Sequence, residues 1–210
     1  MSPSNGVLEA VDLACERGGR SLFRRLSFAL RGGELLRVAG PNGSGKTSLL
    51  RILCGLLSPT AGAVRWDGTD IRRLREEYSR QLVYLGHAPA VKDDLTAAEN
   101  LRITCALAGL SVSSREIQAA LGTFGLDDLP VKRLSQGQRR RAVLARLVVS
   151  ESLPLWLLDE PYAALDAAAG RLVEELIDGH VARGGSVVFT SHQEPKTGAA
   201  QVIDLTGVEA

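Results

Sequence analysis

The segment from Gly40 to Thr47 combines the residue types that bind a phosphate group. Its sequence, GPNGSGKT, fits the pattern G-x-x-x-x-G-K-[ST]. Glycines let the backbone fold tightly round an oxyanion, and a helix that starts beyond Gly45 would aim its unpaired N–H groups at the phosphates. Lys46 would reach the β- and γ-phosphates of a nucleotide, and Thr47 would place its hydroxyl on Mg²⁺. The alternative is a glycine-rich turn before an ordinary helix. The residues expected to contact ATP in this loop are Gly40, Pro41, Asn42, Gly43, Ser44, Gly45, Lys46, Thr47 and Ser48.

Two acidic residues, Asp159 and Glu160, follow the apolar segment Leu155–Leu158. A buried strand explains the apolar residues but does not explain two carboxylates where the strand ends. Asp159 fits the second anchor of the magnesium ion, through water, and Glu160 can polarise a water that attacks the γ-phosphate. Taken alone, the segment also fits a plain core strand followed by a surface turn. Together with the glycine-rich loop, it predicts an enzyme that hydrolyses ATP with Mg²⁺ as cofactor.

Strands alternate with helices along most of the chain, and this order must bring the two motifs together. Helices are expected over Gly45–Cys54 and Asp166–His180, and helical periodicity extends through Thr96–Val149, which starts with a capping box at Thr96–Glu99. A turn is expected at Pro59–Gly62. Strands joined by helices favour a parallel sheet with helices on its faces. The expected strands are Val7–Ala14, Leu26–Leu30, Glu34–Ala39, Val64–Gly68, Gln81–Gly86, Leu155–Leu158, Ser186–Thr190 and Gln201–Leu205.

The composition argues against several classes of protein. The 210 residues include 25 Lys and Arg against 24 Asp and Glu, so no strong overall charge attracts nucleic acid or anionic lipid. Hydrophobic residues make up 45% of the chain, but no apolar run reaches the roughly 20 residues that a membrane-spanning helix needs. Cys15, Cys54 and Cys105 lack the spacing of a metal site, which indicates reduced thiols. Because Met1–Gly6 also lacks a basic leader, these features predict a cytoplasmic protein.

The segment Leu134–Gln138 indicates a second phosphate contact. Ser135 is a good helix N-cap, and a helix that starts there would present N–H groups to an anion. The segment resembles the LSGGQ signature of ABC ATPases, with Gln136 at the more variable central position. In that family the signature contacts the γ-phosphate held by the opposite subunit, so the resemblance implies a head-to-tail homodimer with two ATP molecules between its subunits. For Arg139–Arg141, a solvated basic helix face is preferred to nucleic-acid binding. The signature residues are Leu134, Ser135, Gln136, Gly137 and Gln138.

Two further segments match the ABC family in order along the chain. Ala163–Asp166 resembles the loop that crosses the dimer interface. His192 follows the expected strand Ser186–Thr190 and resembles the switch histidine, which would bind the γ-phosphate or the attacking water. An isolated histidine is otherwise more often structural. The resemblance implies as interface residues Ala164, Leu165 and Asp166, and as catalytic residues Lys46, Glu160 and His192.

The chain departs from the family pattern at two positions. After the expected strand Gln81–Gly86, ABC proteins normally place a glutamine that touches the magnesium site, and here Ala88 is expected at that position. Because alanine has no side-chain amide, either the backbone and His87 replace it or hydrolysis is slow. Upstream of the phosphate loop, Arg17 stands where an aromatic residue usually stacks on adenine. A guanidinium can also stack on a base, so Arg17 is an ATP-binding candidate, and an exposed loop arginine is the equal alternative.

A narrower resemblance covers nearly the whole chain. Leu13–Gly18, Tyr84–Pro89 and Leu95–Leu101 are similar to the ATP-binding subunit of the bacterial cytochrome c maturation system, the haem exporter. This resemblance implies an α/β fold of the P-loop NTPase, ABC ATPase type. We expect a single domain over residues 1–210, with a mainly parallel sheet, a small antiparallel β part and a helical subdomain over about residues 90–150. The implied partners are integral membrane transporter subunits and not nucleic acid, at the cytoplasmic face of the inner membrane.

The function implied by the resemblance is ATP hydrolysis that powers haem delivery to the periplasm or release of a haem-loaded chaperone. One alternative is the ATP-binding subunit of another ABC transporter. A second is a cytosolic ABC ATPase that acts on ribosomes or DNA, although such proteins typically carry two ATPase domains or a long coiled-coil insertion. A third is a nucleotide-gated module that barely hydrolyses ATP; Ala88 suggests it, whereas Glu160 and His192 argue against it.

Overall fold

The fold contains a four-stranded antiparallel sheet and a five-stranded parallel sheet. It is known from a computed structural model, in which residues 6–191 and 201–206 are described. The strands of the antiparallel sheet are β1 Leu8–Arg17, β2 Arg20–Leu30, β4 Ala61–Trp66 and β5 Thr69–Asp70. They lie in the order β2-β1-β4-β5, and Leu8 of β1 pairs with Leu30 on one side and Trp66 on the other.

The parallel sheet carries the expected motifs at one edge. Its strands are β3 Leu35–Ala39, β6 Leu82–Leu85, β7 Leu155–Leu158, β8 Ser186–Thr190 and β9 Gln201–Asp204. They lie in the order β6-β7-β8-β3-β9, and every neighbouring pair runs in the same direction. Because parallel strands end at the same edge of a sheet, the loops that follow β3, β6 and β7 lie close together. The mainly parallel sheet and the separate antiparallel part expected from the sequence are both confirmed.

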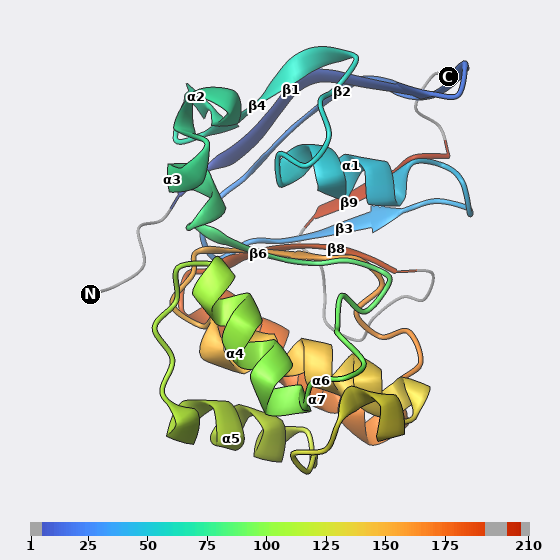
Figure 1. The fold of residues 1–210 in the computed structure, drawn as a ribbon. Helices are drawn as coiled ribbons and strands as arrows, with labels where there is room; N and C mark the ends of the chain where they lie inside the picture. Colours follow the sequence, from blue (N-terminus) through green and yellow to red (C-terminus); the bar gives the residue numbers. More distant parts are fainter. Residues whose placement is uncertain (1–5, 192–200, 207–210) are drawn as a thin grey trace.

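Helices pack on both faces of the parallel sheet. Helix α1, Lys46–Leu53, lies between the two sheets (Figure 1). The helices on the opposite face are α4 Ala97–Leu107, α5 Ser114–Thr123, α6 Gln136–Val149 and α7 Ala167–Ala182 (Figure 1). Side chains alternate across the sheet, so Leu155 and Leu157 of β7 join the core around α1, whereas Trp156 and Leu158 join the core under α4–α7. The parallel sheet therefore separates two apolar cores.

Helices α4 and α6 begin where the sequence predicts. The side chains of Thr96 and Ser135 accept hydrogen bonds from the N–H groups of Glu99 and Gln138. The side chains of Glu99 and Gln138 accept in return from the N–H groups of Thr96 and Ser135. These capping boxes satisfy N–H groups that have no partner inside the helix. Both expected helix starts are confirmed.

The structure differs from the expected elements in several places. Strand β2 begins at Arg20, and not at the expected Leu26. The turn expected over Pro59–Gly62 ends early, because β4 begins at Ala61. Gly62 has a φ of +83°, and a Cβ there would lie 2.4 Å from the carbonyl oxygen of Val11, so the close approach of β1 requires glycine. The short helices α2 Ile71–Leu74 and α3 Glu76–Ser79 were not expected, because a four-residue helix has no apolar period that a sequence can display.

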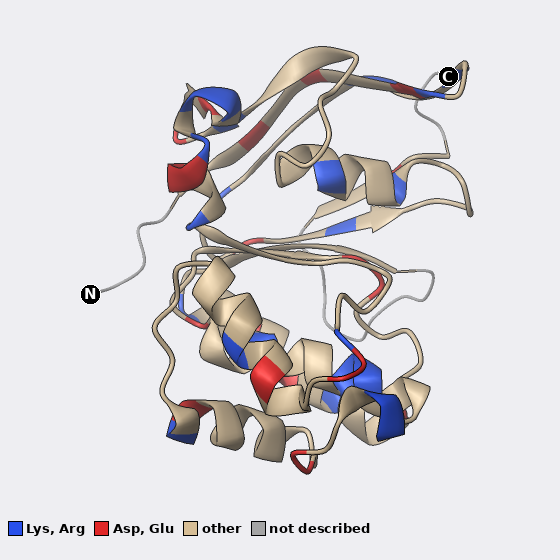
Figure 2. Ribbon diagram, in the orientation of Figure 1, with Lys and Arg blue, Asp and Glu red and all other residues tan. Residues whose placement is uncertain are grey.

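Charged residues of both signs are distributed over both layers of the molecule (Figure 2). This distribution agrees with the near balance of 25 basic and 24 acidic residues. Among the described residues, no helix combines the length and apolar character required to span a bilayer.

The core under α4–α7 contains a histidine stacked on a tryptophan. The ring of His180 on α7 lies parallel to that of Trp156 on β7, with 3.9 Å between ring centroids and 6° between planes. Gly185 permits this packing, because a Cβ at that position would lie 2.2 Å from Nε2 of His180. His180 is only 1% exposed. Burial, together with the nearby charge of Arg183, lowers the pKa of His180 to about 4.

We predict that His180→Phe makes the fold less sensitive to acid. A histidine with a folded-state pKa near 4 and an ordinary pKa of 6.5 stabilises the fold fully above pH 6.5, and this contribution is lost as the pH falls toward 4. Between pH 7 and 4.5 the wild-type chain should lose about 2.5 kcal/mol more unfolding free energy than His180→Phe, measured by urea denaturation. His87→Phe is the control, because His87 is already exposed in the fold. Equal losses in wild type and His180→Phe would contradict the prediction.

Candidate functional site

The loop between β3 and α1 has a shape that only glycine permits at several positions. Gly40, Gly43 and Gly45 have φ angles of +138°, +81° and +104°, which side chains other than glycine rarely adopt. At Gly40, a Cβ would also lie 2.6 Å from the side-chain oxygen of Ser44. The loop therefore curves tightly over the start of α1, as the sequence pattern predicts.

Lys46 stabilises this curvature from inside the loop. It is 8% exposed, and its Nζ donates hydrogen bonds to the carbonyl oxygens of Gly40, at 2.7 Å, and Pro41, at 3.0 Å. An ammonium group has three donors, so one remains for a ligand. Gly45, the N-cap of α1, offers no side chain to the N–H groups of the first turn. The positive end of the helix dipole and a lysine therefore converge on the same space, which suits a phosphate group.

A buried carboxylate connects this helix with two strands. Asp159, at the end of β7, is 1% exposed. Its Oδ2 accepts a hydrogen bond from the hydroxyl of Thr47 on α1, at 2.8 Å, and its Oδ1 accepts from the hydroxyl of Thr190 on β8, also at 2.8 Å. The oxygen of Thr190 in turn accepts from the backbone N–H of Glu160, at 2.8 Å. The two hydroxyls and the carboxylate fix the relative positions of α1, β7 and β8.

Glu160 has an unusual backbone conformation. Its φ is +51°, in the left-handed region that residues other than glycine seldom occupy. Thr190 holds its N–H, and Nη2 of Arg140 donates to its carbonyl oxygen at 2.6 Å. The half-buried residue lies on the wall of the cavity described next. Such strain persists only where the surrounding structure holds it, and it is frequent at functional sites.

These residues line a cavity of about 430 Å³ at the carboxyl edge of the parallel sheet. Exposed Arg17, the last residue of β1, and half-buried Leu22 of β2 also line it. The cavity brings together most of the expected ATP-contacting residues with both acidic residues. It is lined by Arg17, Leu22, Asn42, Gly43, Gly45, Lys46, Thr47, Ser48, His87, Asp159 and Glu160. Gly40, Pro41 and Ser44 shape the loop without lining the cavity.

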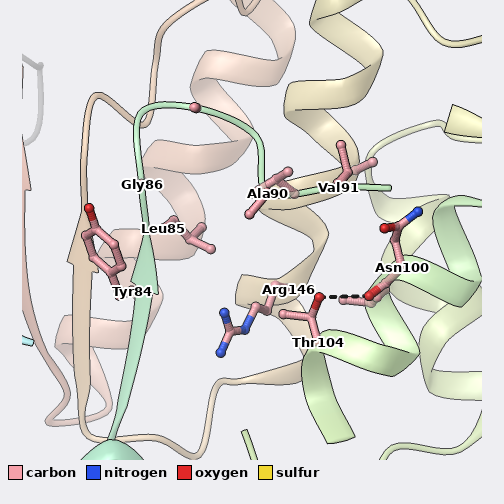
Figure 3. Close-up of a pocket in the computed structure, with 12 residues that line it drawn as sticks. Tyr84, Leu85, Gly86, Ala90, Val91, Asn100, Thr104 and Arg146 are labelled. Carbon is pink, nitrogen blue, oxygen red and sulfur yellow. Dashed lines mark hydrogen bonds between the residues drawn. The ribbon is translucent and has the colours of Figure 1, made fainter. Parts of the chain in front are cut away.

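His87, and not Ala88, faces this cavity from the loop after β6. Ala88 lines a separate cavity of about 60 Å³ between β6, α4 and α6, together with Leu85, Ala90 and Arg146 (Figure 3). The assignment of Ala88 to the position of the family's glutamine stays a prediction. The imidazole of His87 supplies a hydrogen-bonding group at the cavity, as expected if His87 replaces the missing amide.

The oxygen atoms on the cavity wall fit a magnesium ion. Mg²⁺ prefers oxygen ligands and is commonly held by few protein groups, with water and phosphate oxygens completing its shell. The hydroxyl of Thr47 and the carboxylate of Asp159 are such groups, and they are already adjacent. Among the described residues, no cluster of three or more His, Cys, Asp or Glu side chains offers an alternative metal site.

The expected signature segment lies outside this cavity. Ser135 and Gln136 are exposed at the start of α6, and neither lines the cavity of their own chain. Gly137 packs on the expected interface loop, since a Cβ there would lie 3.1 Å from the carbonyl oxygen of Ala164. Asp166, the last residue of that loop, caps α7 by accepting from the N–H of Ala169 at 2.8 Å. The two expected interface segments are therefore neighbours. His192 lies outside the described residues.

The sequence analysis did not identify Thr190 or Arg140 as residues of this site, and it assigned Arg140 to the wrong environment. Thr190 was taken only as the end of a strand. Arg140 was assigned to a solvated basic face, which is wrong, because its side chain is only 3% exposed and bonds to the loops after β6 and β7. Consecutive helical residues are about 100° apart, so Arg139, Arg140 and Arg141 span too wide an arc to share one solvated face. That helical geometry could have indicated that one of the three arginines is buried.

Comparisons with known proteins agree with this arrangement. A family model described as ABC transporter matches residues 23–163. The chain is 54% identical over 199 residues to the cytochrome c biogenesis ATP-binding export protein CcmA of Nitrosospira multiformis, covering 93% of this chain and 96% of that protein. The structure of this chain is similar to a solved ATP-binding subunit of an ABC transporter, with a TM-score of 0.77 and 27% sequence identity. The match covers 89% of this chain and 79% of the solved chain. A dimeric ATP-binding cassette, solved in a post-hydrolysis state with ADP and Pi, has a TM-score of 0.77 at 23% identity, over 89% and 88% of the two chains.

We predict that Thr190→Val lowers the free energy of unfolding by about 2–3 kcal/mol, because it leaves a buried carboxylate oxygen of Asp159 and the N–H of Glu160 without their partner. Valine has nearly the same shape as threonine, so packing should be little affected. Chemical denaturation would measure the loss. The matched control is Thr123→Val on exposed α5, where the hydroxyl bonds only to the carbonyl of Ala119 and a change within about 0.5 kcal/mol is expected. A loss at Thr190 no larger than the loss at Thr123 would contradict the proposed network.

Proposed function

This chain belongs to the ABC transporter family, and we propose that it is the ATP-hydrolysing subunit of an export complex for cytochrome c biogenesis, the haem exporter. It is an ATPase of the ABC type. The observation that carries the proposal is the Thr47–Asp159–Thr190 network beside Lys46, because it assembles a phosphate-binding helix end and two acidic residues round one cavity. Residues 1–210 would act as one ATPase domain.

Within this site, each side chain has a distinct proposed task. The remaining donor of Lys46 and the N–H groups of the first turn of α1 bind the β- and γ-phosphates. Glu160 orients and polarises the attacking water. Arg17, which lines the cavity, would stack on the adenine base. Catalysis then consists of positioning and charge neutralisation.

Magnesium is the proposed cofactor. Thr47 and Asp159 would hold it, directly or through water. When bound, it neutralises charge on the phosphate oxygens. The buried hydrogen bonds of Asp159 hold its carboxylate in a fixed position for this purpose.

A second copy of the chain is the proposed partner at the nucleotide. Residues 134–138 do not line the cavity of their own chain, and Ser135 and Gln136 are exposed at the start of α6. These features suit a head-to-tail homodimer in which the signature contacts the γ-phosphate held by the other copy. The interface loop, Ala164, Leu165 and Asp166, would lie at the same contact, and His192 would act as the switch histidine. The dimeric state of a structurally similar cassette supports this arrangement.

Membrane subunits are the second proposed class of partner. The name of the similar Nitrosospira protein describes an ATP-binding export protein of cytochrome c biogenesis. We therefore place this chain at the cytoplasmic face of the inner membrane, where ATP-driven closing and opening of the dimer moves integral membrane subunits. The work done is haem delivery or the release of a haem-loaded chaperone.

Glu160→Gln is the direct test of hydrolysis. We predict that it lowers steady-state phosphate release by about 100-fold or more, while the affinity for ATP measured with a fluorescent analogue is retained, because the amide cannot accept a proton. Glu76→Gln on exposed α3 is the control and should keep the wild-type rate. Equal rates in Glu160→Gln and wild type would remove Glu160 from the mechanism.

Purification from membranes tests the partners. We predict that tagged Glu160→Gln, extracted with ATP, retains integral membrane proteins and two copies of this chain per complex, because the closed dimer cannot hydrolyse its nucleotide. Mass spectrometry identifies the chains, and light scattering gives the stoichiometry.

The added change Gln136→Glu should release the second copy, since a carboxylate would face the γ-phosphate, although an acidic residue in the first turn does not destabilise α6 itself. Gln118→Glu on exposed α5 is the matched control. A complex that contains a single copy in the presence of ATP would contradict the proposed dimer.

A further inference from the structure

Arg140 joins the two loops that carry the proposed reaction. From α6, its Nη1 donates to the carbonyl oxygens of Gly86, at 3.0 Å, and His87, at 3.3 Å, in the loop after β6. Its Nη2 donates to the carbonyl oxygens of Asp159, at 3.0 Å, and Glu160, at 2.6 Å, in the loop after β7. All four acceptors belong to the main chain. The guanidinium therefore fixes the backbone of both loops, whatever side chains they carry.

Burial makes this contact energetically demanding. Arg140 is 3% exposed, and burial lowers its pKa, while the charges of Asp159 and Glu160 act in the opposite direction. A buried guanidinium costs several kcal/mol unless its donors are satisfied. Here Nη1 and Nη2 have acceptors only while both loops keep their positions, and the buried Nε has no partner. A displacement of either loop would leave buried donors of a charged group without acceptors, so the contact resists such movement.

The contact also accounts for the strained backbone of Glu160. A φ of +51° is unfavourable by roughly 1–2 kcal/mol for a residue with a side chain. Both main-chain polar groups of Glu160 are held, its N–H by Thr190 and its carbonyl by Arg140. With both ends of the residue fixed, the point on the cavity wall from which its side chain extends is fixed as well.

We propose that Arg140 is a positioning residue for ATP hydrolysis, which acts by holding the backbone of Glu160 and His87 at the cavity. This inference rests on the proposed function. Arg140 does not itself line the cavity, so it contacts no nucleotide of its own chain. Because α6 begins at Ser135, less than two turns away, Arg140 also makes the position of Glu160 depend on the helix whose start faces the second copy. Closure of the dimer and alignment of the catalytic carboxylate are thereby linked by one side chain.

The test measures kcat and nucleotide affinity separately in the full chain. Arg140→Met should lower kcat by about 100-fold, the effect of a misplacement of about 1 Å, while the dissociation constant for ATP changes by less than about threefold. Arg140→Lys, which keeps the charge but loses the planar fork, should recover part of the rate. The matched control is Arg141→Met, because Arg141 bonds to the carbonyl of Phe124 in the helical layer, and its rate should stay near that of wild type.

A double-mutant comparison separates positioning from a general structural role. In the Glu160→Gln background, Arg140→Met should lower kcat by no more than about a further twofold, because the carboxylate that Arg140 positions is already absent. An equal loss in both backgrounds, or a wild-type kcat for Arg140→Met, would overturn the role of Arg140. If Arg140→Met does not fold, Arg140→Lys decides by the same comparison. A Glu160→Gln rate equal to wild type would instead overturn the proposed role of Glu160, and this inference with it.

Discussion

The site depends on the burial of one carboxylate, Asp159, between two hydroxyls. A carboxylate that is 1% exposed must have its oxygens satisfied, and Thr47 and Thr190 each supply a hydrogen bond of 2.8 Å. Each hydroxyl comes from a different element, so the buried charge is stable only when α1, β7 and β8 are correctly placed. The cost of burying the carboxylate is thus offset by contacts that also define the shape of the site.

The parallel sheet makes this convergence possible. Its strands all end at one edge, where the phosphate loop follows β3, His87 follows β6 and the acidic pair follows β7. Lys46 and the start of α1 approach this edge from one layer, and Arg140 approaches it from the other. The proposed nucleotide site therefore lies where two separate apolar cores meet the same strand ends. Each core contributes one buried cation, and each cation acts on main-chain carbonyls.

The sequence predicts the parts of the site that are local in the chain. Residues 40–47 and the acidic pair after β7 follow short patterns whose chemistry depends on neighbouring residues, and the capping residue Ser135 was likewise identified from its immediate context. Thr190 and Arg140 could not be found in this way, since their partners lie between 19 and 54 residues away in the chain. Finding that His87 lines the cavity required the path of the loop in space. The short helices α2 and α3 were not predicted, because a helix of four residues is too short to show a periodic apolar pattern.

Helix α1 has a consequence for how the molecule can move. Leu49, Leu50 and Leu53 are each fully buried between the two sheets, so the helix is anchored along its length. Interiors packed at this density do not deform gradually. The start of α1, where the proposed phosphate contacts lie, therefore keeps a fixed position relative to the two sheets, and a nucleotide would meet a preformed surface there.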